Sequence, residues 1–404
     1  MVIALASHDM RNNHPSQRDD CGLYHAVLLR HKFRSLRHVR AQLRAADHAN
    51  LVAATNAATA ADDQTTRDAL LLVIMLHGLL EIANNSTKEW VVHLQGALST
   101  ARHYRATYGA AAFSREVLEF ASNCFAQQET LAATASRAVL GGSGGVRSET
   151  GAWRSEICCP APDLAPTTVH DRFRINGYTG VSTELLNIIA SITAAIGDKR
   201  RRCCEAQRRP SAECPLLPPT SGTGPPPTGD FEAAVRAIQN RLQQLRQWSD
   251  EPDPDSPANL NSAALQEATW VYLRHGLRGE PVESMAIQTD HLPRLLRLLQ
   301  KVHQKRIHPV GSTPYPMWAL FVAACVAQED NRAQVLDWFG ELRRHRPFSN
   351  VPVTMAAVEA IWKKVDLERG GIQWAASGKP DREQSEELIW EGAIHRLGWT
   401  MAFI

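Results

Sequence analysis

The feature that most constrains the fold of this chain is a long apolar run in its first quarter. Residues 69–76 are all apolar, and Leu79, Leu80 and Ile82 extend the pattern, so that no face of a helix here suits water. The run is far shorter than the roughly 18 apolar residues that a membrane span requires. It therefore predicts a helix that is surrounded by other helices of the same protein.

A second helix is predicted directly after a polar break at residues 84–86. Ser86 and Glu89 have the spacing of a capping box, in which each side chain accepts a hydrogen bond from the backbone N–H of the other residue. Apolar residues then recur every three or four positions, at Trp90, Leu94, Ala97, Ala101, Tyr104 and Tyr108. Because Gly96 and Ala97 permit close approach, we expect this helix to lie on the first.

Several short motifs occur in an order that is typical of one protein family. Residues 76–82 read L-H-G-L-L-E-I, and residues 90–97 read W-x-x-H-L-x-G-A. Later segments continue the order, at residues 268–273, 317–324, 350–351, 362 and 398–399. Over nearly its whole length the chain thus resembles the regulatory region of fungal-specific transcription factors. The resemblance implies an all-helical fold, and members usually carry an N-terminal zinc binuclear cluster of six cysteines that binds DNA.

Composition and charge exclude several classes of protein. A chain of 404 residues with 44% hydrophobic composition can bury one large core or two moderate ones. A net charge of +2 and a pI near 8.1 are too mild for a protein coated in nucleic acid. Residues 1–10 lack the charged and long apolar regions of a secretory signal, so we expect a cytosolic or nuclear chain whose cysteines are thiols.

The cysteines predict that the zinc module is missing from this chain. A binuclear cluster needs six cysteines within about 30 residues, with C-x-x-C spacing. The chain has eight cysteines, but they are scattered and none has that spacing. We therefore expect no cofactor here, and zinc only through an upstream module. Either an upstream part is absent, which the apolar residues 3–6 favour, or this member works without the cluster.

Helical patterns separated by Gly- and Pro-rich stretches predict an all-α, irregular multi-helix array with two disordered linkers. The segments are an N-terminal helical part (1–140), a linker (141–172), a helical segment (173–197), a Pro-rich linker (198–229) and a C-terminal helical part (230–404). We expect limited proteolysis to cut first at about 141–170 and 200–229.

The segment 24–43 predicts a helix with one apolar and one basic side. The apolar stripe is formed by Val27, Phe33, Leu36, Val39 and Leu43. The basic side carries Arg30, Arg34, Arg37 and Arg44, with Lys32 and Arg40 nearby. This side is either an ordinary solvated surface or a face for an anionic partner.

A run of four cations, Lys199, Arg200, Arg201 and Arg202, follows a helix that is predicted to stop at Gly197. In a linker, such a run is either a solubilising charge cluster or a nuclear-import signal. On the second interpretation an import receptor reaches the run in extended form. Replacing all four residues with alanine is then expected to shift the protein toward the cytoplasm.

No catalytic constellation is found, and we predict that the protein is not an enzyme. A literal G-x-S-x-G at residues 141–145 lies in the Gly-rich linker, without the strand and helix that form a nucleophile elbow. His93 is predicted to be an interior or boundary histidine on the second helix, and Cys124 a core thiol.

We therefore predict a nuclear regulator of RNA polymerase II transcription, with the transcription machinery or other regulators as partners. A homodimer is possible, DNA is contacted only through an upstream module, and no membrane is involved. The alternative is an interaction or cofactor protein of the same fold that does not bind DNA. A helical enzyme with an unrecognised site is a third alternative.

Overall fold

The computed structural model describes residues 27, 30–37, 39, 41, 60–84, 87–136, 171–208, 228–306, 315–345, 350–369 and 388–403. Within these ranges the chain is helical and has no strand, apart from isolated bridges at Arg174–Trp248 and Ile175–Ser182. The predicted all-α class is confirmed. The linker segment 141–170 and residues 209–227 of the second linker lie outside the described residues.

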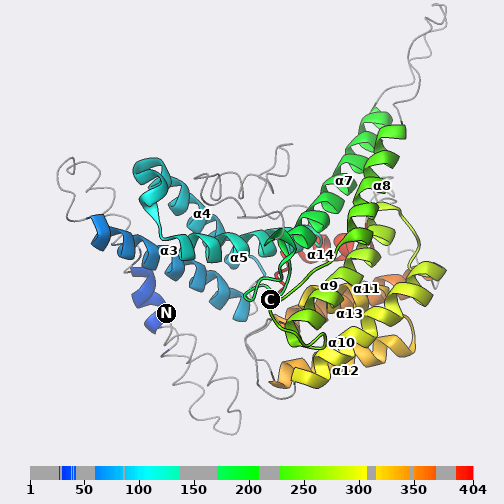
Figure 1. The fold of residues 1–404 in the computed structure, drawn as a ribbon. Helices are drawn as coiled ribbons and strands as arrows, with labels where there is room; N and C mark the ends of the chain where they lie inside the picture. Colours follow the sequence, from blue (N-terminus) through cyan, green and yellow to red (C-terminus); the bar gives the residue numbers. More distant parts are fainter. Residues whose placement is uncertain are drawn as a thin grey trace, which may run out of the picture.

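An N-terminal three-helix unit is formed by α3 (Ala60–Ala83), α4 (Glu89–Tyr108) and α5 (Arg115–Ala133), with a 3-10 turn at Gly109–Ala112 (Figure 1). As expected, α4 lies on α3: a Cβ at Gly96 would lie 4.0 Å from the Ile74 side chain. Helix α4 begins at Glu89 with Lys88 as an N-cap that makes no side-chain capping bond. Ser86 of the predicted capping box lies outside the described residues.

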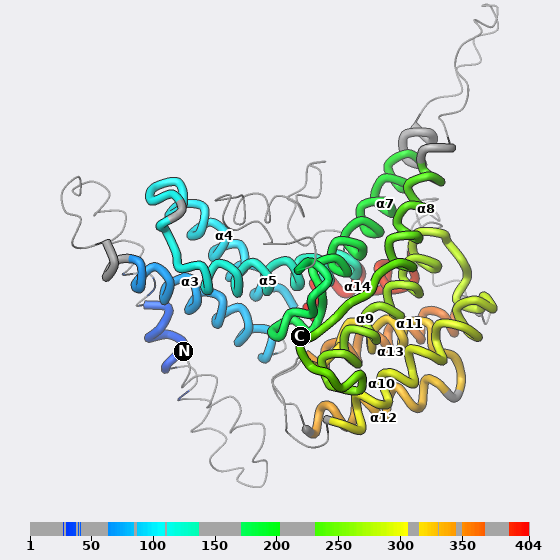
Figure 2. The backbone as a smooth tube through the Cα atoms, viewed as in Figure 1, coloured from blue at the N-terminus to red at the C-terminus, as the bar shows by residue number. Residues whose placement is uncertain are grey.

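A larger C-terminal body contains the helices from α7 onward (Figure 2). They are α7 (Thr183–Arg208), α8 (Thr228–Gln244), α9 (Pro257–Tyr272), α10 (Leu292–Arg306), α11 (Met317–Val326), α12 (Asp330–His345), α13 (Val351–Arg369) and α14 (Ile389–Leu397). A 3-10 turn at Asp171–Phe173 precedes α7, and π-helical segments at Leu273–Leu277 and Ala286–His291 follow α9 and precede α10. Helices α7 and α8 pack side by side and project from the body.

Helix α11 is the centre of the C-terminal body. All ten of its residues are buried, and it packs against α9, α10, α12 and α13. By contrast, Ala69 of α3 is exposed, and Leu72, Val73 and Leu76 are only half-buried. The prediction that the 69–82 run is enclosed on every face is therefore wrong. The helix enclosed in this way is α11, which has no charged side chain.

The two parts meet through hydrogen bonds that join the end of α5 to α11 and α14, and α4 to the segment that follows α14. The indole N–H groups of Trp318 and Trp390 donate to the hydroxyl and the carbonyl oxygen of Thr134, at 2.7 and 2.9 Å. The indole of Trp90 donates to the carbonyl of Thr400 at 3.1 Å. Leu131, near the end of α5, belongs to the core of the C-terminal body. Residues of α4 and of the end of α5 thus hold the N-terminal unit on the C-terminal body.

Residues 30–37, 39 and 41 form a helical segment that packs on α3. Val39 is buried in the core of the N-terminal unit, and Ser35 bonds to His77 at 3.2 Å. Phe33, predicted in the apolar stripe, is instead 59% exposed. The anchoring residues lie on the side of the helix opposite to Phe33, so the stripe prediction is wrong at this position. Leu43, Arg40 and Arg44 lie outside the described residues.

Candidate functional site: the basic turn of α7

The predicted import signal, residues 199–202, lies within α7, and we call this stretch the basic turn. The sequence had predicted that these residues lie in a linker after the helix. The Ser182 hydroxyl accepts a hydrogen bond from the Leu185 N–H at the start of this helix. The helix then continues through Gly197, where a stop was predicted, and ends at Arg208. A glycine inside a helix costs about 1 kcal/mol. Burial of Ile196 and the ion pair between Arg200 and Glu391 offset that cost.

Helical geometry turns the four cations in different directions, because an α-helix has 3.6 residues per turn. Lys199 lies beside Gly279, and Arg201 pairs with Asp198 on the surface. The Arg202 guanidinium lies over the Phe231 ring, 6.0 Å from its centre. Lys199 and Arg200 are partly buried, whereas Arg201 and Arg202 are exposed. The prediction of an extended run at residues 199–202 is therefore wrong.

Arg200 points into the body and forms an ion pair with Glu391 of α14. The Glu391 side chain is 5% exposed and that of Arg200 is 19% exposed, so water screens this pair little. The Arg200 Nε has no hydrogen-bond partner among the described residues. The pair fastens α14 to α7 at a point where removing either charge leaves the other buried.

Tyr272 lies near this ion pair, and His275 lies beside Trp390, which precedes Glu391 in the chain. The Tyr272 hydroxyl is 3.0 Å from the Thr193 hydroxyl. Burial raises the pKa of Tyr272, and the nearby Glu391 carboxylate adds to the effect, so the phenol stays neutral. The His275 ring is 5.4 Å from that of Trp390, and its Nδ1 lies 2.9 Å from the Glu280 carbonyl. Burial lowers the pKa of His275, which favours the neutral imidazole.

A second polar cluster lies inside the N-terminal unit. His77 and His93 stack with ring centres 5.4 Å apart, and the Glu81 carboxylate lies 3.7 Å from His93 and pairs with Lys32. Burial, together with His93 and Lys32, lowers the pKa of His77 to about 4. Burial acts to raise the pKa of Glu81, but its bonds with His93 and Lys32 outweigh burial and hold that pKa low. The cluster ties the segment 30–41 to α3.

In the part of the chain that the structure describes, no group of three or more His, Cys, Asp or Glu residues is placed to hold a metal ion. Cys124 packs against the N-terminal core, as predicted, and burial raises the pKa of its thiol to about 12. Cys325 is buried in α11, and burial raises the pKa of its thiol well above the usual value. A raised pKa favours the protonated thiol, which is a weaker nucleophile than the thiolate.

The partners of the basic turn were not found from the sequence. Glu391 carried a usable signal, since it is the one carboxylate of α14 and lies between Trp390 and Gly392 at the start of that helix, before the basic residues of the last turn. Tyr272 and Thr193 carried no such signal, because tyrosine and threonine are common on helix surfaces. His93 lies on α4 and is half-buried, between the interior and the surface, as predicted.

Comparison with known families gives one result that covers the whole chain. A family model described as the fungal specific transcription factor domain matches residues 1–404. Comparisons with curated proteins and with solved structures found no match. Among the described residues, no helix has the length and apolar character needed to cross a membrane.

Proposed function

Because the chain belongs to the fungal specific transcription factor domain family, we propose that it is the regulatory part of a nuclear regulator of RNA polymerase II transcription. Family membership implies a role in transcription regulation, and the family is generally non-enzymatic. The observation that carries the proposal is the match over residues 1–404. The all-helical fold of the described residues agrees with it, since the family resemblance implies such a fold.

The partners in this proposal are the transcription machinery or other regulators, with a second copy of the chain as a further candidate. Under this proposal, any contact with DNA requires an upstream zinc-cluster module, because the cysteines of this chain lack the spacing of a binuclear cluster. The test joins the chain to an unrelated DNA-binding module in a fungal reporter strain. A change of several-fold in reporter expression is expected. The matched control is the same fusion with Leu320→Ala, which disrupts the core around α11. A reporter that responds equally to both fusions contradicts the proposal.

The purified chain is expected to bind no stoichiometric zinc and to show no sequence-specific affinity for DNA. The reason is the scattered placement of its cysteines, which lack the spacing of a binuclear cluster. Metal analysis that finds about two zinc ions per chain would overturn this expectation. A preference for one duplex sequence that persists at high salt would overturn the second part.

For nuclear import, we propose that the exposed residues Arg201 and Arg202 contribute to receptor binding. Replacing all four cations would also break the Arg200–Glu391 pair, so a loss of import could reflect misfolding. The sharper variant is R201A/R202A, which leaves that pair intact. Its matched control is R343A/R344A, a pair of neighbouring exposed arginines near the end of α12. Only the first variant is expected to raise the cytoplasmic share of a fluorescent fusion. An unchanged distribution removes these residues from the import signal.

A further inference from the structure

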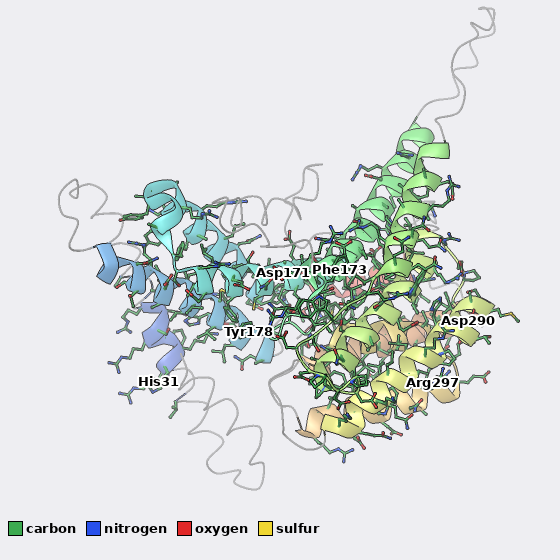
Figure 3. The ribbon with its side chains drawn as sticks, in the orientation of Figure 1. His31, Asp171, Phe173, Tyr178, Asp290 and Arg297 are labelled. Carbon is green, nitrogen blue, oxygen red and sulfur yellow. The ribbon has the colours of Figure 1, made fainter. Side chains whose placement is uncertain are left out.

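The helical segment 30–37 presents an arginine-rich surface with an aromatic side chain at its centre. Arg30, Phe33, Arg34 and Arg37 have i, i+3, i+4 and i+7 spacing, so they share one side of the helix, and all four are exposed. We call these four residues the Arg/Phe face. Figure 3 labels His31 in this segment, which lies below α3 and away from the C-terminal body.

The opposite side of the segment holds it on the protein. Lys32 pairs with Glu81, Ser35 bonds to His77, and Val39 is buried in the core of the N-terminal unit. These three residues also follow helical spacing, and they point away from the Arg/Phe face. The outward orientation of Phe33 is therefore set by anchoring contacts on α3. The helix cannot rotate to bury Phe33 without breaking an ion pair, a hydrogen bond and a core contact.

The charges of this face have no counterpart within the part of the chain that the structure describes. No carboxylate there pairs with Arg30, Arg34 or Arg37, whereas the exposed Lys301 and Lys305 of α10 pair with Asp255 and Asp253. Phe33 is 59% exposed beside these three guanidinium groups. The face thus combines unpaired positive charge with apolar surface.

We propose that the Arg/Phe face binds an acidic amphipathic helix of a partner protein. Carboxylates at i, i+4 and i+7 of such a helix match the three guanidinium groups in spacing, and an apolar side chain at i+3 covers Phe33. An arginine can form two hydrogen bonds with one carboxylate, which fixes the relative orientation of the two groups in addition to the attraction between their charges. Nucleic acid fits less well, because a phosphate backbone offers no apolar group to cover the phenyl ring.

The test measures binding of the full chain to a fluorescent helical peptide with Glu at i, i+4 and i+7 and Leu at i+3. Loss of two ion pairs and gain of two repulsions should weaken binding of R34E/R37E by about tenfold at low salt. Phe33→Ala should weaken binding by about fivefold, and this loss should persist at high salt because it comes from apolar contact. A peptide with Lys in place of Glu should bind R34E/R37E better than the unaltered chain.

The matched control is R294E/R297E on α10, which changes the net charge equally and has the same spacing between two exposed arginines. Figure 3 places Arg297 on the opposite side of the molecule from His31. Equal loss of binding in the two charge-reversed variants would overturn the proposal, as it would indicate attraction by net charge alone. Equal binding of a scrambled peptide would also overturn it. Tighter binding of duplex DNA than of peptide, abolished by R34E/R37E, would replace the proposed partner with nucleic acid. None of these results depends on whether the protein regulates transcription.

Discussion

Helices α3 and α11 are both predicted from apolar runs, yet they occupy different environments. Every residue of α11 is buried, and no charge interrupts it. Helix α3 has a half-buried apolar side, and its buried side includes His77 and Glu81. The C-terminal body is therefore stabilised around an apolar centre. The N-terminal unit combines a smaller apolar core with a polar cluster that holds another helical segment.

The largest expected difference between the two parts comes from the same substitution in each central helix. Leu320→Ala in α11 removes a fully buried side chain and should lower the free energy of unfolding by about 4 kcal/mol. Leu72→Ala in α3 removes a half-buried side chain and should cost about 1 kcal/mol. Urea unfolding followed by circular dichroism measures both. Equal losses would mean that α3 is as enclosed as α11, contrary to the exposure of its side chains.

The next largest effect is expected within the basic turn itself. Arg200→Met removes the cation that pairs with the buried Glu391 carboxylate and should cost about 3 kcal/mol. Arg201→Met, the matched control, removes an exposed pair with Asp198 and should cost less than about 0.5 kcal/mol. Unfolding experiments on the two variants separate a structural arginine from a surface arginine in adjacent positions. Similar stabilities would show that the pair with Glu391 does not fasten α14 to α7.

The polar cluster of the N-terminal unit makes stability depend on pH. The pKa of His77 is about 4 in the folded protein and 6.5 when unperturbed. Above pH 6.5 the His77 side chain is neutral in both the folded and the unfolded protein, so folding is not opposed by its protonation. As the pH falls toward 4, the unfolded state gains the proton first, which should cost about 2 kcal/mol.

The variant His77→Asn tests this dependence. It should be less stable at neutral pH, since it disturbs the stack with His93, but its stability should change less between pH 6.5 and 4. The matched control is His395→Asn, because His395 is exposed at the end of α14. An unchanged slope in His77→Asn would assign the pH dependence to another group, such as the Glu81 carboxylate, whose pKa is held low in the folded protein.

The local periodicity of the sequence was enough to predict the helical class and most helices, because apolar spacing alone decides which side of a helix can be buried. Periodicity was not enough to predict which of two apolar helices is more completely buried. Whether α3 or α11 is enclosed depends on the helices that surround each, and these come from distant parts of the chain. Gly197 illustrates the same limit: a local stop signal was overridden by the contact of Arg200 with Glu391, far along the chain.

The candidate site was predictable in composition but not in geometry. The four cations at 199–202 are evident in the sequence, whereas their division into inward and outward side chains follows from the course of α7. Phe33 fits the apolar stripe by spacing, but Lys32 and Ser35 bind Glu81 and His77 and turn the ring outward. In both places, polar contacts between elements decided an orientation that hydrophobic periodicity left undetermined.

The smallest of the expected effects concerns the junction between the two parts. Thr134→Val keeps the shape of the side chain but removes the hydroxyl that accepts a hydrogen bond from Trp318 and donates one to the Leu131 carbonyl. The buried indole N–H is then left without its partner, which should cost about 1.5 kcal/mol. The bond from Trp390 to the Thr134 carbonyl is retained, so the parts stay in contact. The matched control is Thr107→Val, because the exposed Thr107 hydroxyl bonds only within α4 among the described residues.

If the junction couples the two parts, Thr134→Val should also separate their unfolding transitions, measured by tryptophan fluorescence and circular dichroism in urea. Coincident transitions with unchanged stability would mean that the Thr134 hydroxyl contributes nothing to that coupling.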